Sequence, residues 1–192
     1  MCKWSRLELL KGVAAILLPL LPLGASLKAT TLEQLSLDDM IQKSTSVVRA
    51  RVTGTYTAMA GLDIFTYYRL EVSETWKGSS AALVDVAVPG GAMRGQRQAI
   101  AGAPALNVGD EYVLFLWTSR TGVTQVLGLS QGMFSVKVDT ANTPLLLRPA
   151  AAETMLDKNG RVVADQPMNL KLADVRAKVI GAVFGTAAGA VK

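Results

Sequence analysis

Residues 47–53, VVRARVT, decide the fold class, because Val48, Ala50 and Val52 alternate there with two arginines and a threonine. Alternation with a period of two is typical of a strand with one buried face. A second alternating run covers residues 68–73, and the turn residues Gly61 and Asp63 separate the two runs, which predicts a long hairpin. Residues 112–117, YVLFLW, are apolar on both faces and therefore predict the most buried strand.

Further alternating runs indicate that most of the chain is β-structure. Residues 83–88 and 133–138 repeat the pattern, and residues 93–100 form a more polar run that predicts a strand at a sheet edge. Ser36, followed by two aspartates, predicts a short helix, and residues 170–183 have helical spacing. We therefore expect a mainly β fold, a barrel or a sandwich, with one short amino-terminal helix and one carboxy-terminal helix.

The first 29 residues have the three parts of a secretory signal. Residues 1–11 carry three basic side chains, residues 12–23 form an apolar run with two prolines, and residues 24–29 are rich in small side chains. The apolar run is shorter than the roughly 20 residues that a spanning helix needs. We expect a signal peptide over residues 1–29, a periplasmic or secreted mature protein and no stable membrane span after cleavage.

Charge and cysteine content narrow the function classes. Of 20 basic and 15 acidic residues, four basic and one acidic precede residue 30, which leaves 16 against 14 in the remainder. The remaining basic residues are dispersed, whereas nucleic-acid binders gather them on one face, so we expect no nucleic-acid partner. The only cysteine is Cys2, inside the predicted signal, and the chain contains no histidine. We therefore expect no disulfide, no metal site and no cofactor in the mature protein.

Five segments carry a family resemblance, and they are residues 46–52 (SVVRARV), 68–78 (YRLEVSETWKG), 88–91 (VPGG), 109–116 (GDEYVLFL) and 128–134 (GLSQGMF). Over roughly residues 32–138 their order resembles a family of uncharacterised exported bacterial proteins, related to domains that can precede matrixin-type proteases. The wider pattern is similar to the OB-type barrel of netrin-like and metalloprotease-inhibitor domains. The resemblance implies a small OB-like β-barrel, although such inhibitors act through an amino-terminal cysteine that the predicted mature chain lacks.

The resulting expectation divides the chain into four regions. The strand and helix patterns, the family resemblance and the tight-turn sequence DKNG at residues 157–160 set the divisions. The regions are a signal peptide (1–29), a β-barrel domain (30–142), a β-hairpin with a carboxy-terminal helix packed on the barrel (143–184) and a flexible tail (185–192).

One motif suggests an enzyme. Residues 128–132, GLSQG, satisfy G-x-S-x-G, the nucleophile elbow of serine hydrolases. Ser130 would need a base, which is usually histidine, and Lys77 or Lys137 could replace it only if burial removed its proton. A strand pattern also follows Gly132, where the elbow has a helix. We interpret the motif as a turn and predict that the protein is not an enzyme, with a serine hydrolase using Ser130 as one alternative.

Four residues are candidates for ligand binding. Arg94 and Arg97 lie in the densest polar run, and two guanidinium groups near a glycine turn can hold an anion; a solvated edge strand is the alternative interpretation. Phe65 and Tyr67 fall on the face opposite Tyr68, where aromatic rings can stack on bases or sugars. Aromatic pairs across strands can instead stabilise the sheet itself.

These observations favour an exported, noncatalytic binding or interaction module. Its expected partner is a protein or peptide of the cell envelope. The alternative from another class is a structural or inhibitory partner of an exported protease.

Overall fold

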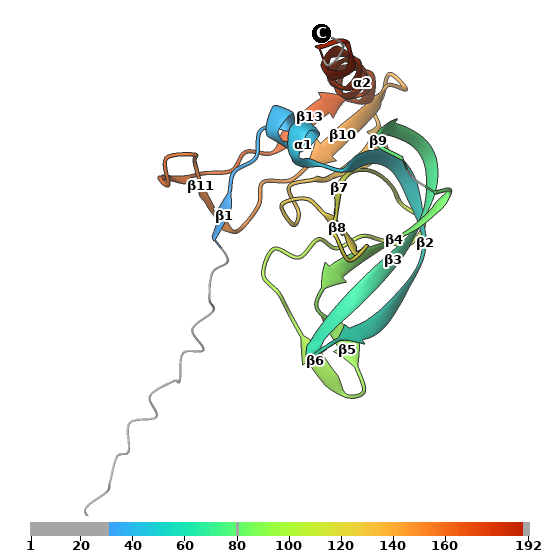
Figure 1. The fold of residues 1–192 in the computed structure, drawn as a ribbon, viewed down its shortest axis with the longest axis vertical. Coiled ribbons are helices and arrows are strands. Elements are labelled where there is room, and N and C mark those ends of the chain that lie inside the picture. The colour runs from blue at the N-terminus through green and yellow to red at the C-terminus, as the bar shows by residue number, and fades with distance from the viewer. Residues whose placement is uncertain (1–30, 80, 190–192) are drawn as a thin grey trace, which may run out of the picture.

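The computed structural model describes residues 31–79 and 81–189 of the 192-residue chain (Figure 1). The predicted signal peptide, Cys2 and the last three residues of the predicted tail lie outside the described residues. The mainly β class, with one short helix near the start and one helix at the carboxy-terminal end, is confirmed.

The described residues form two helices and thirteen strands. The helices are α1 (Leu37–Lys43) and α2 (Leu172–Gly189). The strands are β1 (Thr31–Glu33), β2 (Ser46–Ala60), β3 (Asp63–Lys77), β4 (Leu83–Pro89), β5 (Gly91–Met93), β6 (Gln96–Gln98), β7 (Glu111–Thr118), β8 (Thr124–Val126), β9 (Met133–Val138), β10 (Pro144–Arg148), β11 (Thr154–Leu156), β12 (Val162–Val163) and β13 (Met168–Lys171).

The main sheet is built around the predicted long hairpin. Strands β2 and β3 pair antiparallel as far as Ala60 and Asp63, and Gly61 supplies the left-handed conformation of the turn, with φ 65°. The sheet runs in the order β13-β10-β9-β7-β2-β3-β4, and β8 pairs with β7. In the part of the chain that the structure describes, these pairings follow an open path and do not close into the predicted barrel. The sheet is nevertheless curled, and the curl brings β4 into contact with β8.

Strand β7 is buried on both faces, as its sequence predicts. Leu114 and Leu116 point to one side and Phe115 to the other, and each of the three is at most 1% exposed. The side of β7 that bears Leu114 belongs to an inner cluster, formed by Val48, Ala50, Val52, Leu70, Val86, Val88, Leu106, Tyr112, Leu114, Leu116 and Val126. Alternating residues of the first two predicted strands therefore supply one wall of this cluster.

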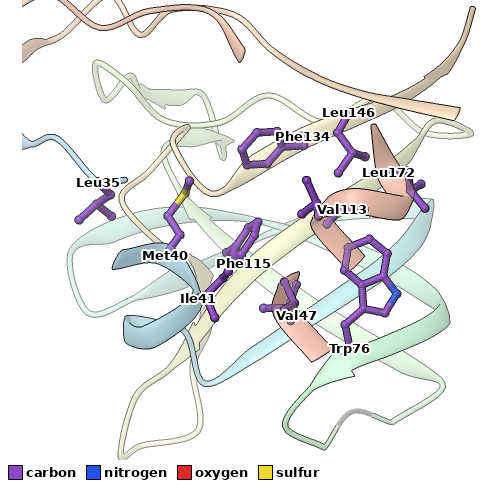
Figure 2. Packing of buried hydrophobic residues seen from close by; sticks show 12 residues of the cluster. Leu35, Met40, Ile41, Val47, Trp76, Val113, Phe115, Phe134, Leu146 and Leu172 are labelled. Atoms are coloured by element: carbon purple, nitrogen blue, oxygen red, sulfur yellow. The ribbon is translucent and has the colours of Figure 1, made fainter. Parts of the chain in front are cut away.

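The opposite face of the sheet is covered by both helices (Figure 2). Phe115 packs there against Phe134 in an edge-to-face arrangement, with ring centroids 5.8 Å apart. Helix α2 contributes three buried residues and α1 contributes two. The outer cluster consists of Leu35, Met40, Ile41, Val47, Trp76, Val113, Phe115, Phe134, Leu146, Leu172, Val175 and Val179.

Local sequence explains where α1 begins. Ser36 caps α1, because its hydroxyl accepts from the backbone N–H of Asp39 at 3.1 Å while the Asp39 carboxylate accepts from the backbone N–H of Ser36. Helix α2 continues to Gly189, beyond residue 183, where the helical spacing predicted its end.

The predicted single strand over residues 93–100 is wrong. Strands β5 and β6 form a small hairpin there, with a turn at Arg94 and Gly95, whose φ values are 50° and 77°. Positive φ at both central residues is typical of the tight turns that join twisted strands. Arginine rarely adopts this conformation, so alternation alone did not reveal the turn.

Candidate functional site

Phe65 and Tyr67, two of the four predicted ligand-binding residues, belong to an aromatic row on the outer face of β3. The Tyr67 ring stacks on Tyr56 of β2, with centroids 4.9 Å apart and planes 6° apart, and Phe65 tilts against Tyr67 at 6.5 Å. The Tyr56 hydroxyl donates to Asp85 of β4 at 3.0 Å, so its ring extends across β3. Burial and this hydrogen bond raise the pKa of Tyr56.

Arg69 completes the row. Its guanidinium lies 5.9 Å from the centre of the Tyr56 ring and donates two hydrogen bonds to Asp85, at 3.0 and 3.1 Å. Side chains of the same sheet therefore contact Tyr56 and Tyr67, and these contacts stabilise the pairing of β2 with β3. The three rings are partly exposed, and Tyr56 is 43% exposed.

The other two predicted residues lie on the β5–β6 hairpin, which packs against the β2–β3 turn (Figure 1). The side-chain carbonyl of Gln98 accepts from the backbone N–H of Ile64 at 2.7 Å, and its amide donates to Asp63 at 3.1 Å. The backbone N–H of Gly90 donates to the Ile64 carbonyl at 2.7 Å. These contacts hold the open end of the β5–β6 hairpin against the start of β3, next to the β2–β3 turn.

We call residues 59–65 and 92–97 the hairpin end. It combines the exposed Arg94 and Arg97 with Leu62, which is 95% exposed, and Met59. The structure thus brings both predicted arginines and Phe65 to one end of the molecule, whereas Tyr67 lies further along β3. Sequence reasoning missed Leu62, although an apolar residue between Gly61 and Asp63 in a tight turn was a visible signal.

The GLSQG motif forms a turn before β9, as predicted. Gly128 and Leu129 have φ values of 64° and 57°. Its buried polar side chain is that of Gln131, whose side-chain carbonyl accepts from Leu35 N–H at 2.8 Å and whose amide donates to the Glu33 carbonyl at 3.0 Å. The turn therefore holds the segment between β1 and α1.

The two lysines considered as bases are engaged elsewhere. The Lys77 ammonium donates to three backbone carbonyls at the end of α1, those of Ile41, Gln42 and Ser44. Burial lowers the pKa of Lys77, but each of its three protons has an acceptor in this position. Lys137 is half exposed and faces Asp110 at 4.0 Å.

A polar cleft of about 390 Å³ opens between the β1–α1 segment and the chain from β10 to β13. Sequence reasoning did not find it, because its walls come from residues 34–39, 148, 157–158 and 165–168, which share no motif spacing. Five charged side chains line it, and they are Asp39, Arg148, Asp157, Lys158 and Asp165.

The floor of the cleft holds a buried ion pair. Arg148 and Asp165 are 5% and 2% exposed, and Arg148 Nη2 donates to Asp165 at 3.0 Å and to the Gln166 carbonyl at 3.1 Å. Burial opposes ionisation of Asp165, but hydrogen bonds from the Ala151 N–H and from Arg148 outweigh it and lower the pKa of Asp165. Arg148 Nε is buried and has no hydrogen-bond partner among the described residues.

The mouth of the cleft carries a second ion pair. Lys158, 69% exposed, donates to Asp39 at 3.0 Å. Hydrogen bonds from Ser36 and then from Lys158 hold the pKa of Asp39 at about 2. One oxygen of Asp157 accepts from the N–H groups of Asn159 and Arg161 at 2.8 and 2.9 Å and so shapes the predicted tight turn between β11 and β12.

Comparisons with protein families, with curated proteins and with solved structures found no match for this chain. The resemblance over residues 32–138 therefore stays a prediction. Within residues 31–79 and 81–189, no helix is both long and apolar enough to cross a membrane. In the same ranges, no group of three histidine, cysteine, aspartate or glutamate side chains is arranged to hold a metal ion.

Proposed function

We propose that this protein is an exported, noncatalytic interaction module that binds a protein partner of the cell envelope through its hairpin end. The observation that carries the proposal is Leu62, 95% exposed at a turn that hydrogen bonds hold against a second hairpin. A large apolar side chain on a turn that hydrogen bonds fix in place is suited to fill a pocket on a partner, because the turn loses little conformational freedom on binding.

The composition of the hairpin end supports a protein partner. The hairpin end also contains Met59, Phe65, Arg94 and Arg97, and methionine, aromatic residues and arginine are enriched in protein interfaces. The hairpin end contains two arginines and one acidic residue, Asp63, so its net charge is +1. We therefore expect the partner to present an apolar pocket with an acidic rim.

The noncatalytic part of the proposal rests on the chemistry of the candidate nucleophile. The chain contains no histidine, and its one cysteine is Cys2. The GLSQG turn uses its buried residue, Gln131, to hold the backbone near Leu35, and Lys77 donates to the end of α1. The exported part rests on the signal pattern of residues 1–29.

Site-specific photo-crosslinking in cells tests the proposal. A photoreactive residue at position 62 of the full chain should give one defined protein adduct, whereas the same residue at position 83 should not, since Leu83 is also exposed (61%) but lies on β4. The double change Arg94→Gln and Arg97→Gln should weaken binding of the identified partner about tenfold and reduce its salt dependence. Crosslinking at position 62 to lipid, or equal adducts from both positions, would contradict it.

A further inference from the structure

The polar cleft offers hydrogen-bonding groups that the fold leaves unused. Arg148 lines its floor with a side chain that is 5% exposed, and Nε of that side chain is buried and unpaired among the described residues, so a ligand reaches Arg148 only through the atoms that line the cleft. Of the described residues, only Asp39 accepts from the Lys158 ammonium, which has three protons. Asp157 uses one carboxylate oxygen for its turn, and no described residue donates to the other.

The charges of the cleft limit the class of ligand. Arg148 is paired with Asp165 and Lys158 with Asp39, and Asp157 adds one negative charge without a basic partner. A simple anion would be repelled by this excess of negative charge, and a simple cation would be repelled by the exposed Lys158 ammonium beside Asp157. A ligand that carries both charges satisfies both groups.

We propose that the cleft binds a small zwitterion, an α-amino acid or a dipeptide. Its carboxylate accepts from Lys158 at the mouth and from Arg148 at the floor, and its ammonium group donates to the second oxygen of Asp157. Leu35 and Met168, which also line the cleft, contact an apolar side chain. The volume of about 390 Å³ falls in the range of small-molecule sites.

Calorimetric titration of the purified full-length protein with defined probes tests this inference. L-leucine or L-leucyl-L-leucine should bind, and the matched analogues that lack one charge should bind at least about tenfold more weakly. The analogues are N-acetyl-leucine, which lacks the ammonium group, and leucinamide, which lacks the carboxylate. If neither zwitterion binds, or if N-acetyl-leucine binds as tightly as leucine, the proposal is wrong.

Variants connect the binding to the cleft. Lys158→Gln and Asp157→Asn should each weaken binding about tenfold, and asparagine keeps the oxygen that accepts from the turn N–H groups, so the fold is retained. Lys178→Gln is the matched control, because Lys178 is also an exposed lysine paired with an aspartate of α1, Asp38, but does not line the cleft. Unchanged affinity in both cleft variants, or equal loss in the control, would overturn the assignment. The test does not depend on the hairpin end.

Discussion

The side-chain carbonyl of Gln131 accepts a hydrogen bond from the backbone N–H of Leu35 at 2.8 Å, across 96 positions of the sequence. The same side chain donates to the Glu33 carbonyl. One buried amide therefore binds a backbone N–H and a backbone carbonyl of the segment that leads into α1. This contact gives the G-x-S-x-G sequence a structural role that does not involve the Ser130 hydroxyl.

Replacing Gln131 with leucine should lower the free energy of unfolding by about 1–3 kcal/mol, because the buried N–H of Leu35 loses its acceptor. Urea denaturation followed by circular dichroism measures the change. Ser130→Ala is the control and should change stability by less than about 0.5 kcal/mol. A serine-reactive probe that labels Ser130 stoichiometrically would contradict the structural interpretation of the motif.

Truncating Phe115 to alanine should cost about 3–5 kcal/mol, because the ring is fully buried and packs on Phe134. Phe65→Ala should cost much less, since Phe65 is only partly buried near the hairpin end. Thermal and denaturant unfolding of both variants gives the comparison. Similar small losses at the two positions would mean that β7 is not the central strand.

Adding a methyl group at Gly132 should destabilise the fold. A Cβ there would lie 2.7 Å from the Leu127 carbonyl oxygen and 3.0 Å from that of Phe115, so backbone must shift. We expect Gly132→Ala to lower the free energy of unfolding by about 1–3 kcal/mol. Gly54→Ala is the matched control, since no atom lies within 4 Å of its added Cβ. If the two variants have equal stability in denaturant titrations, the close approach at Gly132 is not present.

The capping box of α1 predicts a defined dependence on pH. Because the folded-state pKa of Asp39 is about 2, below its ordinary 3.8, its ionised form stabilises the fold above pH 3.8, and this contribution is lost as pH falls through 2. Asp39→Asn should therefore lower stability at pH 5 and have little effect near pH 2. Asp38→Asn, at a largely exposed neighbour, is the control. A stability difference for Asp39→Asn that stays constant from pH 5 to pH 2 would refute this assignment.

The local patterns predicted most of the elements because they depend on neighbouring residues. Alternation placed β2 and β3, the continuous apolar run of residues 112–117 predicted the burial of both Leu114 and Phe115 in β7, and the cap at Ser36 marked the start of α1. The turn at Arg94 escaped prediction, because arginine is rare at positive φ and the flanking strands have only three residues each. The hairpin end was predicted in part, through Arg94, Arg97 and Phe65.

The sequence alone thus determined the mainly β class, the two helices and the two-sided burial of β7, since side-chain periodicity decides which face of an element is apolar. Only the tertiary structure decided the open path of the sheet, the link between Gln131 and Leu35, and the cleft around Arg148 and Asp165. These features join segments far apart in the chain. The packing of the whole molecule decides which distant segments come into contact, and the local spacing of residues does not predict those contacts.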